Sequence, residues 1–322
     1  MQHQVLLYYH FYHETNPQGF RDEHQKFCEE HGLKGRVYIA FEGINGTVSG
    51  PLESCEKYQS FLRQHVGLEK VVFKTEEVDH HVFEKMKTKV RPYILNMGFQ
   101  PVDDVDPSEK TGKHLSPKEW RSTLENNKDI VILDIRNNYE SKVGHFENAI
   151  CPDLSGFTEF KDWIPELKEK YQDKKILMYC TGGIRCEKYS SLLLREGFED
   201  VNQLNGGILN YAKEEGGKHF LGKCFVFDDR LTTDVDPDNQ DVLSQCQHCG
   251  EPEYRYVNCA NMECNDLFII CDACAQKHEA TCSDLCFAST TKRPFNSENF
   301  RVPFRSKGKV FPELGRRQFK KD

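Results

Sequence analysis

One cysteine of this chain, Cys180, lies where a thiol can act as a nucleophile. It ends the apolar run KKILMYC (174–180), which is typical of a buried strand. A loop of small residues and an arginine follows it: Thr181, Gly182, Gly183, Ile184 and Arg185. Ligands collect at the carboxyl ends of strands in open α/β sheets, and a glycine-rich loop before a helix turns its N–H groups toward an anion. We therefore expect a thiolate of lowered pKa, with Arg185 as a fixed positive charge beside it.

A cluster of cysteines near the C-terminal end forms a second group of reactive residues. Eight of the fourteen cysteines are Cys246, Cys249, Cys259, Cys264, Cys271, Cys274, Cys282 and Cys286. The N-terminal residues show no export signal, so we expect reduced thiols rather than a disulfide scaffold. Cysteine pairs separated by two residues, such as Cys246 and Cys249, present two thiolates to one Zn²⁺. Eight ligands would make two closed, structural sites. Metal binding would then supply folding energy to this segment.

The cysteine spacing leaves several points open. The pairs could join sequentially or in a cross-braced order, and His248 or His278 could replace one cysteine. A compact metal-free fold with reduced cysteines, or a set of redox-active thiols, is the alternative to zinc.

The elements around Cys180 alternate between strand and helix from residue 114 to residue 223. Ser116, Pro117 and Glu119 predict a capping box at the start of a helix over 116–126. The later elements are predicted as strand 129–136, helix 158–171 interrupted near Pro165, strand 174–180, a helix from Cys186 to Gly197, strand 201–204 and helix 206–217. This alternation predicts a parallel sheet flanked by helices, the α/β class.

The first 98 residues predict a separate α+β domain. Its elements are expected as strand 5–9, helix 19–32, strand 35–41, a hairpin turn within the segment 43–50, helix 52–66 and strand 90–95. The order βαββαβ is typical of a ferredoxin-like or acylphosphatase-like sandwich. Asn45-Gly46 is a hairpin signal, so Gly43, Asn45 and Gly46 are interpreted as turn formers. The polar stretch 99–113 is interpreted as a linker.

The loop that begins at Cys180 resembles the active-site loop of rhodaneses. The resemblance includes Cys180 to Cys186, the strand end Asp134-Ile135-Arg136, the segment Gly144 to Ile150, and the turn Gln203 to Gly207. It implies that Cys180 carries sulfur as a persulfide, supported by Asp134 and Arg136. Rhodanese loops have four residues between cysteine and arginine, as here, whereas the related phosphatases have five, so phosphatase activity is disfavoured. Cys186 either resolves a Cys180 persulfide or packs in the helix.

One pair of residues imitates a metal motif. His145 and Glu147 have the spacing of the start of an iron-binding facial triad. We interpret them instead as part of the rhodanese pattern, in a turn between strands, because no third ligand can be named.

The order of the parts resembles the bacterial tRNA uridine(34) hydroxylase family over nearly the whole chain. The residues that carry this resemblance are Gly43 to Thr47, Arg136 to Glu140 and Phe225 to Arg230. It implies hydroxylation of the wobble uridine of tRNA at C5 with O₂ as co-substrate, through Cys180. No flavin, haem or nucleotide site is evident. The alternatives are a thiosulfate or persulfide sulfurtransferase and a zinc-bearing tRNA-binding adaptor.

The expected division of the chain is 1–98, a linker at 99–113, a rhodanese domain at 114–223, a Cys-rich segment at 224–300 and a basic tail at 301–322. The net charge of −8 argues against bulk attraction to nucleic acid, but the tail carries eight Lys and Arg residues against two acids. Together with the tail, the candidates for contact with tRNA phosphates are Lys85, Lys87, Lys89 and Arg91. We expect a cytoplasmic protein without a membrane span, and no protein partner can be inferred.

Overall fold

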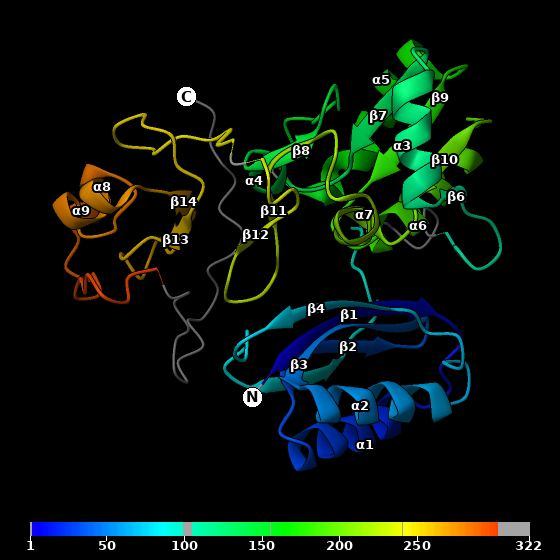
Figure 1. Ribbon diagram of the computed structural model, residues 1–322, viewed down its shortest axis with the longest axis horizontal. Helices are drawn as coiled ribbons and strands as arrows, with labels where there is room; N and C mark the ends of the chain where they lie inside the picture. The colour runs from blue at the N-terminus through cyan, green and yellow to red at the C-terminus, as the bar shows by residue number, and fades with distance from the viewer. Residues whose placement is uncertain (1, 99–104, 155, 240, 302–322) are drawn as a thin grey trace. The chain divides into compact units, whose positions relative to one another are not determined.

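A computed structural model describes residues 2–98, 105–154, 156–239 and 241–301 (Figure 1). The chain forms two compact units, Met1–Ser244 and Gln245–Asp322. Among the described helices, none has the length and apolar character needed to cross a bilayer.

The N-terminal part of the first unit is an α+β sandwich. Its elements are β1 (His3–Phe11), α1 (Pro17–Glu30), β2 (Lys34–Ala40), β3 (Gly43–Pro51), α2 (Leu52–Gln64), β4 (Phe73–Val78) and β5 (Met86–Val90). The sheet has the order β4-β1-β3-β2-β5, and α1 and α2 cover one face of it (Figure 1). Leu6 and Tyr8 of β1 belong to the core on that face, together with Phe20 and Tyr58. Because side chains alternate along a strand, Leu7 and Tyr9 lie on the opposite face.

Two details of this domain differ from the sequence prediction. Asn45-Gly46 is not the hairpin turn, because both residues lie inside β3, paired with Tyr9 and Tyr8 of β1. The chain turns just before β3, where Gly43 has φ +140° and an added Cβ would come within 2.1 Å of His10 O. The predicted strand 90–95 is also wrong, since β5 ends at Val90 and Pro92 has no N–H to continue the ladder.

The rest of the first unit is built on a parallel sheet of order β6-β10-β9-β7. Its elements are β6 (Lys113–Leu115), α3 (Pro117–Asn126), β7 (Ile130–Asp134), α4 (Asn138–Ser141), β8 (Gly144–Phe146), η2 (Phe157–Glu159), α5 (Phe160–Tyr171), β9 (Lys175–Tyr179), α6 (Ile184–Arg195), β10 (Val201–Leu204), α7 (Gly207–Glu215), β11 (Phe220–Phe225) and β12 (Thr232–Asp234). The capping box of Ser116 and Glu119 is confirmed. The α/β architecture predicted from the alternating pattern is confirmed as well.

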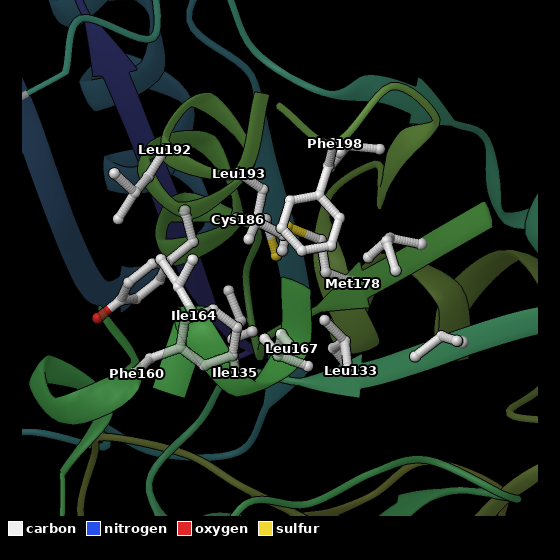
Figure 2. Close-up of a cluster of buried hydrophobic side chains, with 14 of the residues drawn as sticks. Leu133, Ile135, Phe160, Ile164, Leu167, Met178, Cys186, Leu192, Leu193 and Phe198 are labelled. Atoms are coloured by element: carbon white, nitrogen blue, oxygen red, sulfur yellow. The ribbon is translucent and has the colours of Figure 1, made fainter. Parts of the chain in front are cut away.

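Both faces of this sheet are buried. Leu133 and Met178 pack with α5 and α6, and Figure 2 shows this cluster with Phe160 and Leu193. The other face packs with α3 and α7, where Trp120 has no exposed surface. Burial on both faces explains why the central strands β7 and β9 are continuous apolar runs.

Two local predictions for this sheet domain are wrong. The helix α5 is not interrupted at Pro165, which lies inside it, and the helix begins with Phe160. His145 is in strand β8, paired with Leu221 of β11, rather than in a turn.

The second unit is small and contains little regular structure. Strands β13 (Tyr256–Asn258) and β14 (Leu267–Ile269) pair antiparallel, and the helices are α8 (Asp272–Lys277) and α9 (Asp284–Phe287). Its core consists largely of cysteines with a few apolar residues such as Val257, Phe268 and Ile270.

Candidate active site and metal centres

Cys180 follows the last residue of β9, and its side chain has no exposed surface. The N–H of Gly183 donates to Cys180 Sγ at 3.1 Å. Gly183 has φ +100° and is the N-cap of α6, so the loop turns through a left-handed conformation directly beneath the sulfur. The strand end and the helix start thus place backbone donors around one thiol.

The surroundings of Cys180 favour the thiolate. Burial by itself raises the pKa of Cys180, but the Cys186 thiol, the charge of Arg185 and the N–H groups of Arg185 and Gly183 outweigh it and lower the pKa to about 5. Burial and the neighbouring Cys180 raise the pKa of Cys186 well above its usual value. Cys186 is therefore a neutral S–H donor to an anionic sulfur, and Figure 2 shows it within the apolar cluster.

Arg185 is held by a residue that the sequence analysis did not assign to the site. Its Nη1 and Nη2 donate to Glu140 Oε2 and Oε1 at 2.6 and 2.8 Å, and Glu140 is fully buried. Thr181 Oγ1 also donates to Glu140 Oε1 at 3.2 Å. Glu140 thus ties both sides of the loop to α4. Its position in the segment Arg136 to Glu140, quoted for the family resemblance, was the available signal.

Asp134 and Arg136 form a second buried pair at the end of the neighbouring strand β7. Arg136 Nη2 donates to Asp134 Oδ2 and to Gly144 O, each at 2.6 Å. Tyr179 OH donates to Asp134 Oδ2 at 2.8 Å, which connects this pair to the residue before Cys180. The pair connects the ends of two strands, and among the described residues it forms no hydrogen bond with Cys180.

Strand β1 of the N-terminal domain covers the Cys180 loop. A Cβ added to Gly182 would lie 2.8 Å from Leu7 Cδ2, and one added to Gly183 would lie 2.9 Å from Tyr9 OH. Tyr9 OH donates to Glu187 Oε1 at 2.8 Å, and Lys188 Nζ donates to Glu42 Oε2 at 2.7 Å. Sequence reasoning missed this cover, although the alternation along β1 could have indicated that Leu7 and Tyr9 point away from the domain's own core.

A cavity of about 330 Å³ opens beside the loop, within the first unit. Leu7 and Lys74 line it from the N-terminal sheet, and Thr181, Phe227 and Arg230 line it from the other domain. The Cys180 side chain does not line the cavity, but the next residue does.

The eight clustered cysteines gather into two groups of four. The groups are Cys246, Cys249, Cys271 and Cys274, and Cys259, Cys264, Cys282 and Cys286. Within each group the sulfur atoms lie within 4.8 Å of one another, so each group could hold a metal ion. The groups interleave along the chain and contain no histidine. The rings of His248 and His278 instead stack on each other, with their centres 4.0 Å apart.

The donor set of each group suits a tetrahedral metal site that selects soft ions. A hydrogen bond from Cys282, against the cost of burial, lowers the pKa of Cys259 to about 5. Four sulfurs leave no position for a substrate, which is typical of a structural site.

The remaining candidate residues lie apart from these centres. Lys85, Lys87, Lys89 and Arg91 are exposed on or beside the edge strand β5. The basic tail, after Arg301, lies outside the described residues. His145 Nδ1 lies 3.1 Å from Phe146 O, and among the described residues neither His145 nor Glu147 belongs to a group of metal ligands.

The sheet, the loop and the buried pairs define a protein of the rhodanese class. Residues 116–214 match the rhodanese-like domain, residues 3–94 the UPF0176 acylphosphatase-like domain, and residues 221–287 the rhodanese C-terminal domain.

Curated relatives extend this likeness over most of the chain. Proteins named tRNA uridine(34) hydroxylase are 44% identical in Cytophaga hutchinsonii, covering 91% of this chain and 93% of the relative, and 47% identical in Shouchella clausii, covering 88% of each. The Staphylococcus aureus protein of that name is 43% identical and covers 93% of this chain and 94% of its own length. The chain belongs to the tRNA uridine(34) hydroxylase family.

Proposed function

We propose that this protein hydroxylates the wobble uridine of tRNA at C5, with O₂ as co-substrate and Cys180 as the reactive group. The observation that carries the proposal is the buried Cys180 thiol, whose pKa is lowered to about 5 beside the N–H groups of Gly183 and Arg185. The family membership supplies the substrate class, because the curated relatives bear the name of this activity.

The residues around the sulfur have distinct tasks in this proposal. Cys180 is a thiolate at neutral pH and is the nucleophile, while Cys186 donates its S–H to that thiolate. Arg185 contributes positive charge, and its Nη1 and Nη2 groups donate to Glu140. Its main task is therefore to stabilise the loop rather than to contact substrate. Asp134, Arg136, Thr181, Gly182 and Ile184 are positioning residues.

The second unit completes the proposal as a folded module with two structural Zn²⁺ ions, each held by four thiolates. The donor chemistry of the two cysteine groups supports zinc rather than a hard cation. We further propose that the tRNA phosphates meet Lys85, Lys87, Lys89, Arg91 and the tail 301–322, and that the protein works in the cytoplasm, where its substrate is.

A sulfurtransferase is the second candidate. The enclosed cradle around Cys180, in which Gly183 N–H contacts the sulfur, also suits a persulfide. A plain sulfurtransferase would not need the N-terminal domain, whose Tyr9 lies on the loop, and we therefore rank it second. The adaptor hypothesis is disfavoured because a protein that only binds tRNA has no use for an activated thiol.

Mass spectrometry of wobble nucleosides from a deletion strain, complemented with variants, tests the proposal. Wild type should restore 5-hydroxyuridine, Cys180→Ala should restore none, and Cys186→Ala should show a smaller defect. Cys55→Ala, a buried cysteine of the N-terminal domain, is the matched control and should behave as wild type. Normal hydroxylation by Cys180→Ala would refute the catalytic assignment. Efficient sulfur transfer to cyanide without hydroxylation would establish the sulfurtransferase instead.

A further inference from the structure

The cavity beside the Cys180 loop has the size and position of a site for one small ring. Its volume of about 330 Å³ is near the lower limit of ligand pockets, which run from about 300 to 1,000 Å³. Thr181, which follows Cys180 directly, forms part of its wall. An occupant would therefore lie against the loop that holds the sulfur.

Lys74 supplies the cavity with a cation. In β4 it pairs with Leu7 of β1, and it therefore lies on the sheet face that covers the loop. Its Nζ is 4.3 Å from the centre of the Tyr9 ring. Among the residues that the structure describes, no acidic side chain forms an ion pair with it. Arg230, by contrast, is bound to Asp228 and Glu76 at 2.6 and 2.5 Å.

Lys74 lies within the electrostatic influence of the active centre. Burial lowers the pKa of Lys74 to about 8, while attraction to Cys180 and Glu187 acts in the other direction. The ammonium is thus charged at neutral pH and partly stripped of water, which strengthens a hydrogen bond to a carbonyl oxygen.

Phe227 supplies an aromatic surface. Its side chain is 49% exposed although the residues on both sides of it are buried. The guanidinium carbon of Arg185 lies 5.9 Å from the centre of its ring, and the ring of Phe225 packs edge-on at 5.3 Å. An exposed ring held in place by such contacts is a platform on which a nucleobase can stack.

We propose that this cavity binds the target base as a flipped-out uracil, which stacks on Phe227 and accepts a hydrogen bond from Lys74 through a carbonyl oxygen. This inference rests on the proposed function for the identity of the base. Enzymes that act on a base extrude it into a pocket and read it by stacking and by hydrogen bonds to its polar edge, and the cavity offers both. The base would then enter from the tRNA loop to lie beside Thr181 and the covered sulfur.

Fluorine NMR of a base analogue tests the site without turnover. The probe is an anticodon stem-loop RNA with 5-fluorouridine at position 34, bound to full-length protein carrying Cys180→Ala. A matched RNA carries the fluorine at position 33. We expect a shifted resonance for position 34 alone. We further expect the shift to vanish with Phe227→Leu, to persist with Phe227→Tyr and to shrink with Lys74→Met.

Two surface variants serve as controls, Phe41→Ala, an exposed aromatic outside the cavity, and Lys57→Met, whose ammonium pairs with Glu53. Both should keep the shift. In turnover, Phe227→Leu should raise KM roughly tenfold, as expected for the loss of one base-stacking contact.

The outcomes separate the two proposals. A shift at position 34 that survives both Phe227→Leu and Lys74→Met, or bound RNA that shows no shift at all, would overturn the base site. A shift that depends on Phe227 in a protein without hydroxylase activity would instead keep the site and refute the proposed reaction.

Discussion

Glu140 and Arg185 form a bidentate ion pair beneath the Cys180 loop, with Nη–Oε distances of 2.6 and 2.8 Å and almost no exposed surface on either side chain. Such a pair fixes the relative position of the two side chains. Both charged groups lose their hydration on burial, and only the two-pronged contact between them offsets that loss. The pair therefore anchors Arg185, at the end of the Cys180 loop, to α4.

Arg185→Lys should destabilise the protein strongly. A lysine cannot form the two-pronged contact, and leaving Glu140 poorly paired in the interior should lower the free energy of unfolding by about 3 kcal/mol. Urea unfolding measures the loss. Arg121→Lys is the control, since Arg121 pairs with Glu125 and Glu215 at the partly exposed surface and should change stability by less than about 1 kcal/mol. Equal losses in the two variants would contradict the special role of the buried pair.

The Cys180 thiol should titrate near pH 5. Its pKa is lowered, so the thiolate exists above this pH and is lost on acidification, which the difference in ultraviolet thiolate absorbance between wild type and Cys180→Ala follows. Cys186→Ala removes a donor to the anion and should move the midpoint upward by roughly one to two pH units, since a hydrogen bond to a charged group contributes about 1.5–3 kcal/mol. Cys55→Ala should leave the midpoint in place. A midpoint above pH 8 in wild type would show that the cradle does not activate the sulfur.

The cover formed by Tyr9 should control access to Cys180. Tyr9→Ala removes the ring over Gly183, and we expect iodoacetamide to alkylate Cys180 several-fold faster, as local opening becomes easier. Tyr9→Phe is the matched variant: it keeps the ring, loses the hydrogen bond to Glu187, and should cost about 1 kcal/mol of stability with little change in alkylation. Peptide mass spectrometry locates the modified thiol. Identical rates in all three proteins would argue against the cover.

The cysteine groups should bind two Zn²⁺ per chain. Elemental analysis of protein purified without chelator should give about two ions, and Cys246→Ser and Cys259→Ser should each remove one, because the two residues belong to different groups. Cys55→Ser should keep both. A cooperatively folded second unit with almost no metal would overturn this expectation.

The sequence predicted the sheet that holds Cys180 mainly through β7 and β9, which are buried on both faces and are therefore continuous apolar runs. Strand β4, Phe73–Val78, escaped prediction because it is polar and at most half-buried. Its Lys74 lies over the active loop through pairing with β1, and such long-range pairing leaves no local signal.

Other site residues were missed for related reasons. The family resemblance included Glu140, but no spacing rule predicts that a buried carboxylate takes up the donors of Arg185. The pairing of the cysteines is likewise a three-dimensional property: residues as far apart in the chain as Cys246 and Cys274 meet in one group, and the spacing alone allowed both orders.

The interleaving of the two cysteine groups affects how this part of the chain can be made. Cys259 and Cys264 lie, along the chain, between the two halves of the group that starts at Cys246 and ends at Cys274. During synthesis on a ribosome, the first group is complete once Cys274 has emerged. Cys259 and Cys264 have then also emerged, but their partners Cys282 and Cys286 have not. A chain that ends between Cys274 and Cys282 therefore has a complete first group and only two of the four ligands of the second. The two remaining thiols of such a truncated product are open to binding other metals and to oxidation.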